Sequence, residues 1–526
     1  MTATPQQPQH MIPADYILAG LYPDQRAVAT ELNGPMRVLA GAGTGKTRAI
    51  THRIAYGIAI GRYQGPRVLA LTFTLRAAEE MRTRLHQLGA HGVQARTFHS
   101  AALRQLAYFW PQVVGGTFPS IVQNKAALIT EAANRLRIST DRSLLRDLAS
   151  LIEWAKVQLL TPDTIMQRLS EKQLPLAITP QNMQRIFQAY EDLKDERNLI
   201  DFEDVLLLTI AMLEEDEKLA ATVRNQYRHF VVDEYQDVSP LQQRLLDVWL
   251  GGRDDICVVG DASQTIYSFT GATSRYLLDF ARRYRGAHTV KLTRDYRSTP
   301  QIVSVANDVL ARSSQREGTV RLSSQRDGGA QVTYRTYDND RAEAEGVAAS
   351  IADLIAGCMA PHSIAVLMRT NGQSKAFEEA LGARGIPVAV AGGKPFFARD
   401  DVRTAISRLR TAAAASEEGA LGEVVRDVLS GVGWSPEAPS GQAGSERWSN
   451  MNAIVGWADD SKAATLAGFV AELDERIAYQ VEPDKAGVEL ATIHAAKGLE
   501  WDAVFLVGLS EGLLPISYAK PPAASE

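Results

Sequence analysis

The sequence predicts an α/β protein built on parallel sheets. Short apolar runs at 38–40, 67–73, 230–232 and 256–260 are each followed by a turn and a helix-like stretch, and this alternation is typical of strands covered by helices on both faces. Polar or charged residues come directly after the runs. Because ligands bind at the carboxyl ends of parallel strands, we expect a functional site at that edge of the sheet.

The pattern changes twice along the chain. Residues 103–198 carry helix-type periodicity with few strand signals, and a second set of strand-like runs begins near 289 and resumes at 488–493. With 526 residues the chain is too long for one core. We therefore expect two sheet domains, each interrupted by an insertion: a flexible terminus 1–20, a first sheet domain 21–102 and 199–288 with a helical insertion 103–198, and a second sheet domain 289–394 and 486–526 with a small helical insertion 395–485.

The composition is that of an ordinary globular protein, with 45% apolar and 22% charged residues. The net charge of −5 gives no bulk sign of nucleic-acid binding, so a DNA site would have to be a local basic surface. The two cysteines, Cys257 and Cys358, lie outside any metal-binding or disulfide pattern. No signal peptide and no long apolar run is visible, and we expect a cytoplasmic protein without membrane contact.

Residues 40–47, AGAGTGKT, form a phosphate loop between a strand and a helix. The strict pattern begins with Gly and this one with Ala40, so the match is to the relaxed form. Lys46 is expected to reach the β- and γ-phosphates of ATP, the Thr47 hydroxyl is expected to ligate Mg²⁺, and backbone N–H groups surround the phosphates; the loop positions assigned to the nucleotide are Ala42, Gly43, Thr44 and Gly45. The alternative is a Gly-rich turn with a chance GKT, which the flanking strand and helix disfavour.

Asp233 and Glu234 follow the apolar run at 230–232. A carboxylate at a strand end can hold Mg²⁺ beside a phosphate loop, and a second one can activate water. We assign these two roles to Asp233 and Glu234 in that order. In isolation the pair would read as an exposed acidic turn, but the phosphate loop upstream favours the functional interpretation.

Further motifs occur in a characteristic order. Together they resemble the superfamily 1A DNA helicases of the UvrD/PcrA/Rep type, and most closely the actinobacterial members of the UvrD group; the matching segments are DQ (24–25), TFT (72–74), TFHS (97–100), DEYQD (233–237), GDASQTIY (260–267), DYRST (295–299) and TIHAAKGLE (492–500). The resemblance implies two RecA-like P-loop NTPase domains and an ATP-dependent 3′-to-5′ DNA helicase or translocase in repair or replication. It also implies ATP and Mg²⁺ as cofactors, and single-stranded DNA and single-strand/duplex junctions as partners.

The resemblance also implies residue roles. In the nucleotide site, Gln25 would read the adenine edge, and Arg48 and Tyr296 would enclose the adenine ring. Gln264 would sense the γ-phosphate, Arg297 would approach it, and Glu500 would hold the ribose. A translocase must tolerate any sequence, so its DNA contacts should be stacking and backbone contacts; the candidates are Phe73, Phe202, Tyr267 and Phe269 for stacking, and Thr97, His99 and His494 for the backbone.

The chain departs from the family pattern in several places. Phe269 and Thr270 stand where the family usually has Trp and Arg, and the second insertion is short. The chain ends soon after the 492–500 motif, so the last family motif, with its arginine finger, would lie downstream. We therefore expect an incomplete second domain and reduced activity of this fragment. A catalytically weak DNA- and nucleotide-binding module and the motor portion of a helicase–nuclease remain as alternatives.

Overall fold

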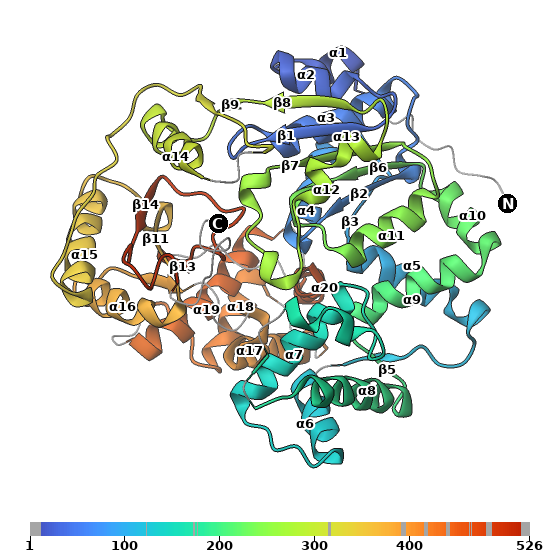
Figure 1. The fold of residues 1–526 in the computed structure, drawn as a ribbon. Helices are drawn as coiled ribbons and strands as arrows, with labels where there is room; N and C mark the ends of the chain where they lie inside the picture. The colour runs from blue at the N-terminus through green and yellow to red at the C-terminus, as the bar shows by residue number, and fades with distance from the viewer. Residues whose placement is uncertain are drawn as a thin grey trace. The chain divides into compact units, whose positions relative to one another are not determined.

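The computed structural model describes residues 12–122, 124–171, 174–175, 177–313, 317–390, 396–414, 419–437, 442–461, 463, 465–479 and 487–516. Figure 1 follows the chain from end to end. The chain divides into two compact units, Met1–Val332 and Thr333–Glu526. Across the described residues, no helix combines the length and the apolar character that a membrane crossing requires.

A six-stranded parallel sheet forms the centre of the first unit, which confirms the predicted fold class. Its strand order is β3-β2-β6-β7-β1-β8, and the strands are β1 (Met36–Ala40), β2 (Val68–Thr72), β3 (Gln94–Thr97), β6 (His229–Val232), β7 (Ile256–Gly260) and β8 (His288–Leu292). Every residue of β2 and β7 is buried. Helices cover both faces, as the near-continuous apolar runs predicted.

Each face of this sheet has its own hydrophobic core. Along β2, Leu69 and Leu71 belong to one core and Val68 and Ala70 to the other, because successive strand residues point to opposite faces. The helices of one face are α1 (Ala14–Leu18), α2 (Pro23–Thr30), α3 (Lys46–Ala59) and α4 (Leu75–Gln87); those of the other are α5 (Phe98–Val113), α9 (Phe202–Glu215), α10 (Glu217–Gln226), α11 (Pro240–Leu250), α12 (Arg275–Leu278) and α13 (Phe280–Arg283).

Two segments differ from what the sequence led us to expect. Residues 1–11 lie outside the described part of the chain, but within the terminus expected to be flexible α1 places Ile17 in the core at 2% exposure. After β8, the first unit continues through β9 (Arg294–Asp295), α14 (Pro300–Arg312) and β10 (Ser323–Ser324), where β9 and β10 pair in parallel. The compact first unit therefore extends beyond residue 288.

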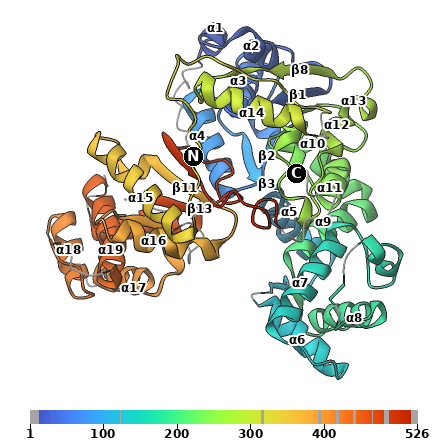
Figure 2. The same cartoon turned by 60° about the vertical axis from the view of Figure 1, so that its left-hand side comes forward.

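The helical insertion of the first unit has a core of its own. It contains α6 (Lys125–Arg135), α7 (Arg142–Val157) and α8 (Pro180–Glu196), which lie together in Figure 2. A two-stranded parallel ladder joins its ends, formed by β4 (Ser120–Ile121) and β5 (Leu199–Ile200). Helix α5 lies within the range assigned to the insertion from the sequence, yet it packs on the main sheet.

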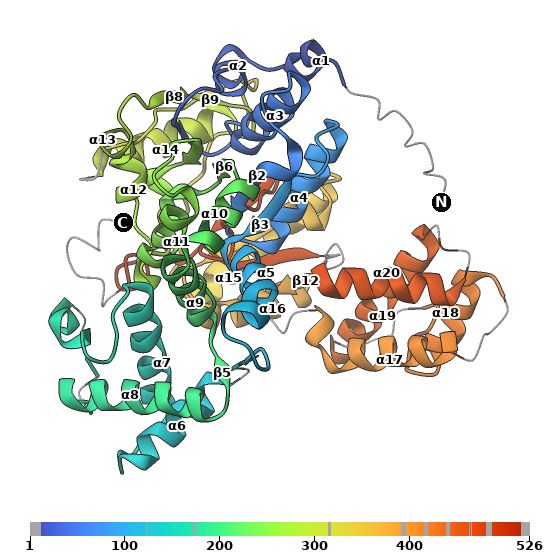
Figure 3. The ribbon, with the colours of Figure 1, turned by 90° about the vertical axis from the view of Figure 1, so that its right-hand side faces the viewer.

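The second unit contains a four-stranded parallel sheet of order β12-β13-β11-β14. Its strands are β11 (Ile364–Met368), β12 (Val388–Val390), β13 (Val488–Thr492) and β14 (Ala503–Leu506), and α15 (Asp340–Ala356) and α16 (Ser374–Gly382) share its core. Between β12 and β13, four helices form a separate core, seen together in Figure 3: α17 (Asp400–Ala414), α18 (Leu421–Ser430), α19 (Gln442–Asp460) and α20 (Leu466–Tyr479).

The two cysteines have opposite environments. Cys257 lies inside β7 at 2% exposure, and burial raises the pKa of its thiol. Cys358 is exposed in the turn after α15. Neither thiol is in a disulfide.

Candidate nucleotide and DNA site

The phosphate loop lies between the end of β1 and the first turn of α3, as predicted. Gly43 and Gly45 have left-handed backbone conformations, with φ of 70° and 75°, and glycine adopts these at little cost. The Thr44 hydroxyl donates to the Gly41 carbonyl at 2.9 Å and closes the loop. A loop of this shape presents backbone N–H groups at the N-terminus of the 14-residue α3, where an anion is favoured.

Lys46 and the two strand-end carboxylates meet beside this loop. Lys46 Nζ lies 3.1 Å from Glu234 Oε1, and the Thr47 hydroxyl donates to Asp233 Oδ2 at 3.4 Å. Burial alone would lower the pKa of Lys46, but the carboxylates of Glu234 and Asp233 outweigh it and the net pKa is raised. Burial and the neighbouring Glu234 raise the pKa of Asp233 to about 6. The site thus holds one ammonium against two carboxylates and is suited to a further cation.

The donor set at Thr47 and Asp233 fits Mg²⁺. Both side chains offer oxygen, the ligand type that Mg²⁺ prefers. Adjacent ligands of an octahedral Mg²⁺ lie roughly 3 Å apart when each bond is about 2.1 Å, and the two oxygens here are 3.4 Å apart. The Thr47 and Asp233 oxygens would need to move only slightly toward each other to bind the same Mg²⁺ ion.

Gln236 is a member of this site that sequence reasoning missed. It is fully buried, and its Nε2 donates to the carboxylate of Glu234 while its Oε1 accepts from the backbone N–H of Asp261 at 3.0 Å. Asp261 in turn accepts from Gln264 Nε2 at 2.7 Å. Gln236 therefore connects the carboxylate after β6 with the segment after β7. The amide stands inside DEYQD, but only the fold shows which two strand ends it joins.

Glu234 has an unusual backbone. Its φ is 51°, a left-handed conformation that is rare for residues other than glycine. Such conformations cost free energy and concentrate at functional sites, where the surroundings hold them. The contacts with Lys46 and Gln236 hold the carboxylate in place.

The segment that carries Tyr296 and Arg297 docks on the phosphate loop. The backbone N–H of Tyr296 donates to the Gly43 carbonyl at 2.9 Å. The buried Asp295 accepts from the backbone N–H groups of Arg297 at 2.7 Å and Ser298 at 2.9 Å. A Cβ added to Gly43 would lie only 2.3 Å from Asp295 Oδ1. The first unit therefore brings Tyr296 and the exposed Arg297 to the loop, 250 residues away in sequence.

Tyr296 has an aromatic partner that the sequence did not suggest. The Tyr22 and Tyr296 rings stack with centroids 4.7 Å apart, and Arg294 lies 5.7 Å from the Tyr22 ring and pairs with Asp24 at 3.1 Å. Burial and the nearby Asp24 raise the pKa of Tyr296 to about 12. An aromatic residue just before Pro23 was the only sequence signal for this pair.

The other two residues assigned to adenine also lie around the loop. Gln25, 2% exposed, donates from Nε2 to the Thr44 carbonyl at 3.0 Å. Arg48 donates to the Gly20 carbonyl at 3.2 Å. Their roles toward adenine remain predictions, but Gln25, Arg48 and Tyr296 converge on one end of the phosphate loop.

Several predicted DNA contacts gather around a cavity of about 180 Å³ in the first unit. Its walls include Phe73, His99 and Tyr267 together with Val157, Glu203, Asp237 and Thr270. Phe202 is 57% exposed beside it, and its ring lies 6.1 Å from that of His99 in an edge-to-face arrangement. Burial lowers the pKa of His99, so the imidazole is neutral near pH 7.

The remaining predicted DNA residues have different positions. Thr97 caps the N-terminus of α5, where its hydroxyl accepts from the backbone N–H of Ser100 at 3.1 Å. The side chain of Phe269 lies outside the described part of the structure. His494 and Glu500 follow β13 in the second unit, where burial lowers the pKa of His494. Their assigned roles stay predictions.

Comparison with known proteins identifies the family. The family model of the UvrD/REP helicase N-terminal domain matches residues 21–285, and that of the UvrD-like helicase C-terminal domain matches 290–437 and 440–525. The chain is 46% identical to "ATP-dependent DNA helicase UvrD2" of Mycobacterium tuberculosis (strain ATCC 25618 / H37Rv) over 97% of this chain and 75% of the relative. It is 31% identical to "ATP-dependent DNA helicase UvrD1" of the same strain (98% and 80%) and 30% identical to "ATP-dependent DNA helicase Rep" of Escherichia coli (strain K12) (94% and 86%). The phosphate loop, its strand-end carboxylates and these matches together mean that the chain belongs to the UvrD/REP family of helicases.

Proposed function

We propose that this protein is an ATP-driven translocase on single-stranded DNA that moves from 3′ to 5′ and separates duplexes at single-strand junctions, acting in DNA repair or replication in the cytoplasm. One observation carries the proposal. The short segment 234–237 joins the carboxylate beside Lys46 to the aromatic cavity. Glu234 contacts Lys46, Gln236 contacts Glu234, and Asp237 lines the cavity. A change at the nucleotide can therefore reach the DNA through residues 234–237.

The same geometry suggests how the nucleotide side works. An incoming γ-phosphate competes with Glu234 for Lys46, and the released carboxylate becomes available to orient and deprotonate the attacking water. Thr47 and Asp233 would hold Mg²⁺, which neutralises charge on the phosphate oxygens. Arg297, on the segment docked at Gly43, approaches the γ-phosphoryl group, while Gln264 senses its presence through Asp261.

On the DNA side, we propose that bases stack on Phe202 and on the aromatic lining of the cavity. Base–aromatic stacking tolerates any sequence, which a translocase requires. The neutral His99 can hydrogen-bond to the DNA backbone without adding a positive charge to the site. Gln236 then connects base occupancy in the cavity with the position of Glu234.

The test combines nucleotide binding with DNA-stimulated ATPase. Lys46→Ala should abolish DNA-stimulated ATP turnover and weaken the binding of a fluorescent ATP analogue. Lys218 is an exposed lysine on α10, and Lys218→Ala should change neither quantity. Unchanged nucleotide binding in Lys46→Ala would contradict the proposal. For polarity, the protein should displace streptavidin from the 5′ end of a biotinylated oligonucleotide faster than from the 3′ end, and the reverse preference would overturn the stated direction.

A further inference from the structure

Three lysines of the helical insertion converge on the first turn of α9. Lys125 comes from the start of α6, Lys156 from α7 and Lys194 from α8. The side chains of Lys156 and Lys194 are only 3% and 2% exposed. Because a buried ammonium is costly unless it is paired and hydrogen-bonded, the partners of these lysines must be held firmly.

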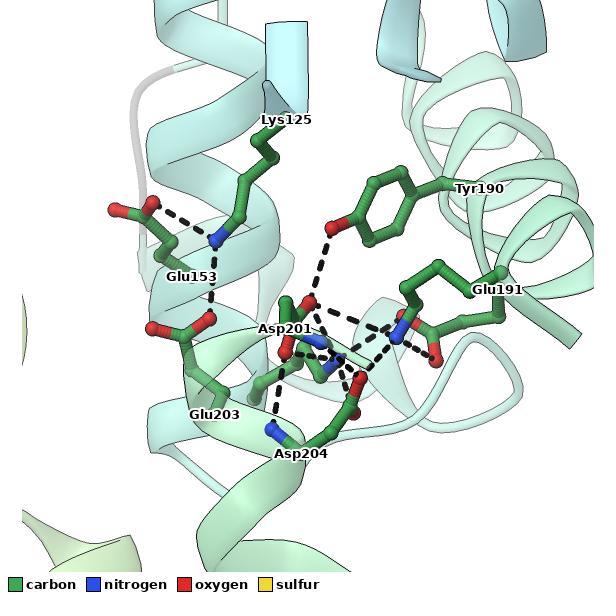
Figure 4. A network of polar contacts seen from close by, with 9 residues as sticks. Lys125, Glu153, Tyr190, Glu191, Asp201, Glu203 and Asp204 are labelled. Atoms are coloured by element: carbon green, nitrogen blue, oxygen red, sulfur yellow. Dashed lines mark hydrogen bonds and ion pairs between the residues drawn. The ribbon is translucent and has the colours of Figure 1, made fainter. Parts of the chain in front are cut away.

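Their partners are the carboxylates at the N-terminus of α9. Lys156 Nζ lies 2.9 and 2.8 Å from the two oxygens of Asp201 and also binds Asp204. Lys194 binds Asp204 and lies 2.8 Å from Glu191, and Tyr190 donates to Asp201 at 3.0 Å. Figure 4 shows Asp201 and Asp204 at the centre of these contacts.

Lys125 holds the same turn from its outer side. Its Nζ lies 2.9 Å from Glu203 and 2.9 Å from Glu153 of α7, and Figure 4 shows these residues beside the central group. Within the turn, Asp201 and Asp204 cap each other's backbone, because each accepts from the other's N–H at 2.9 Å. Lysines from all three insertion helices thus bind the three acidic residues of the turn 201–204.

Phe202 is the exposed member of these four residues. Its neighbours Asp201, Glu203 and Asp204 are all bound by insertion lysines, whereas its ring points to solvent beside His99. The lysine contacts lie close to the cavity, because the cavity is lined by Glu203 and by Val157, the residue after Lys156. Because the Phe202 ring is 57% exposed, its position depends strongly on the backbone of the turn that carries it.

We propose that Lys125, Lys156 and Lys194 are positioning residues for DNA binding: they hold the first turn of α9 so that Phe202 stands at the mouth of the cavity and stacks on a base. The inference rests on the proposed function, because it assumes that single-stranded DNA binds at this cavity. It gives the insertion an indirect part in DNA binding, through the first turn of α9. The lysines themselves do not touch DNA; they act through Phe202.

A double-mutant cycle on the full chain tests the proposal. The variants are Lys156→Met, Phe202→Ala and their combination, and the measured quantity is the oligo(dT) concentration that gives half-maximal ATPase stimulation. Phe202→Ala should raise this concentration by about one to two orders of magnitude, the usual worth of one base–aromatic stack. Lys156→Met should raise it about tenfold in the wild-type background and less than twofold when Phe202 is already Ala, because both changes remove the same contact.

Arg135→Met is the matched control. Arg135 also lies in the insertion, but its partners Glu131 and Glu196 belong to α6 and α8 rather than to α9, so DNA half-saturation should not change. If Lys156→Met does not fold, Lys125→Met replaces it. The Lys125 side chain is 19% exposed and pairs with Glu203 of the same turn, so its loss should disturb the fold less.

The possible outcomes distinguish a failure of the proposed DNA path from a failure of the positioning role of the lysines. No effect of Phe202→Ala would reject this DNA path and with it the DNA part of the proposed function. A large effect of Phe202→Ala, combined with an equal effect of the lysine variant in both backgrounds, would leave the DNA path intact and reject the positioning role. A lysine variant that lowers thermal stability without changing DNA half-saturation would reject it as well, because it would show a purely structural role.

Discussion

Gly43 offers a clean test of how the segment at 295–298 depends on the phosphate loop. Its φ is +70°, and a Cβ there would lie 2.3 Å from Asp295 Oδ1 and 2.9 Å from the Cβ of Arg297. Gly34 has almost the same φ, +69°, but a Cβ there meets nothing within 4 Å. Gly43→Ala and Gly34→Ala therefore share the backbone strain, and only the first adds a collision.

The expected magnitudes follow from this difference. A left-handed alanine costs about 1–2 kcal/mol, so Gly34→Ala should lower the free energy of unfolding by that amount. Overpacking typically adds about 1–3 kcal/mol, and in Gly43→Ala it falls on Asp295, which holds the backbone of Arg297 and Ser298. We expect the segment to move away from the loop, and the loss of the stacking predicted between Tyr296 and adenine should weaken ATP binding about tenfold or more.

Calorimetric titration with ATP and with tripolyphosphate distinguishes the two ways in which Gly43→Ala could act. Tripolyphosphate has no base, so it reports only on the loop, whereas ATP reports on the loop and on Tyr296. We expect a larger loss for ATP than for tripolyphosphate in Gly43→Ala, and little change for either ligand in Gly34→Ala. Equal ATP affinity in the two variants, or equal losses for both ligands, would refute the reasoning.

Three further predictions concern the first unit. Lys156→Met leaves the buried Asp201 without its main partner and should lower the free energy of unfolding in urea by about 3–5 kcal/mol, whereas Arg135→Met removes a solvent-exposed pair and should change it little; similar losses would contradict this. Gln236→Leu should lose most of the stimulation of its ATPase by oligo(dT), because the link from Glu234 to Asp261 is removed; full stimulation would show that the link is not needed. The pKa of His99 is lowered on folding, so the unfolded chain binds the proton more readily below about pH 6.5 and stability should fall as the pH drops through that range; His99→Asn should reduce this loss, and an identical pH profile would count against it.

The sequence predicted the parallel strands and the phosphate loop because their signals are local. Strands such as β2 and β7 are buried on both faces, and the loop combines small residues with Lys46 and Thr47 within a single turn. The helical character of the insertion was likewise visible in its periodicity. These features depend on neighbours in sequence, which is why residue patterns reveal them.

The contacts that organise the site could not be predicted in this way. Lys156 and Lys194 have the sequence pattern of ordinary charges on helix surfaces, but the fold buries them against the carboxylates at the start of α9. The stacking of Tyr22 on Tyr296 and the docking of Asp295 on Gly43 join residues more than 250 positions apart. Helix α1 was missed because two apolar residues, Ile17 and Leu18, do not make a periodic pattern.

Of the two cysteines, only the exposed Cys358 is accessible to a labelling reagent. Cys257 is enclosed in β7 with a raised pKa, so it forms little thiolate near neutral pH and a maleimide cannot reach it. Cys358 is exposed and lies in the second unit. A thiol-reactive fluorophore should therefore attach at one defined position without any mutation. With a second dye carried by the nucleotide or by the DNA, energy transfer would measure the distance from Cys358 to the bound ligand in the native chain.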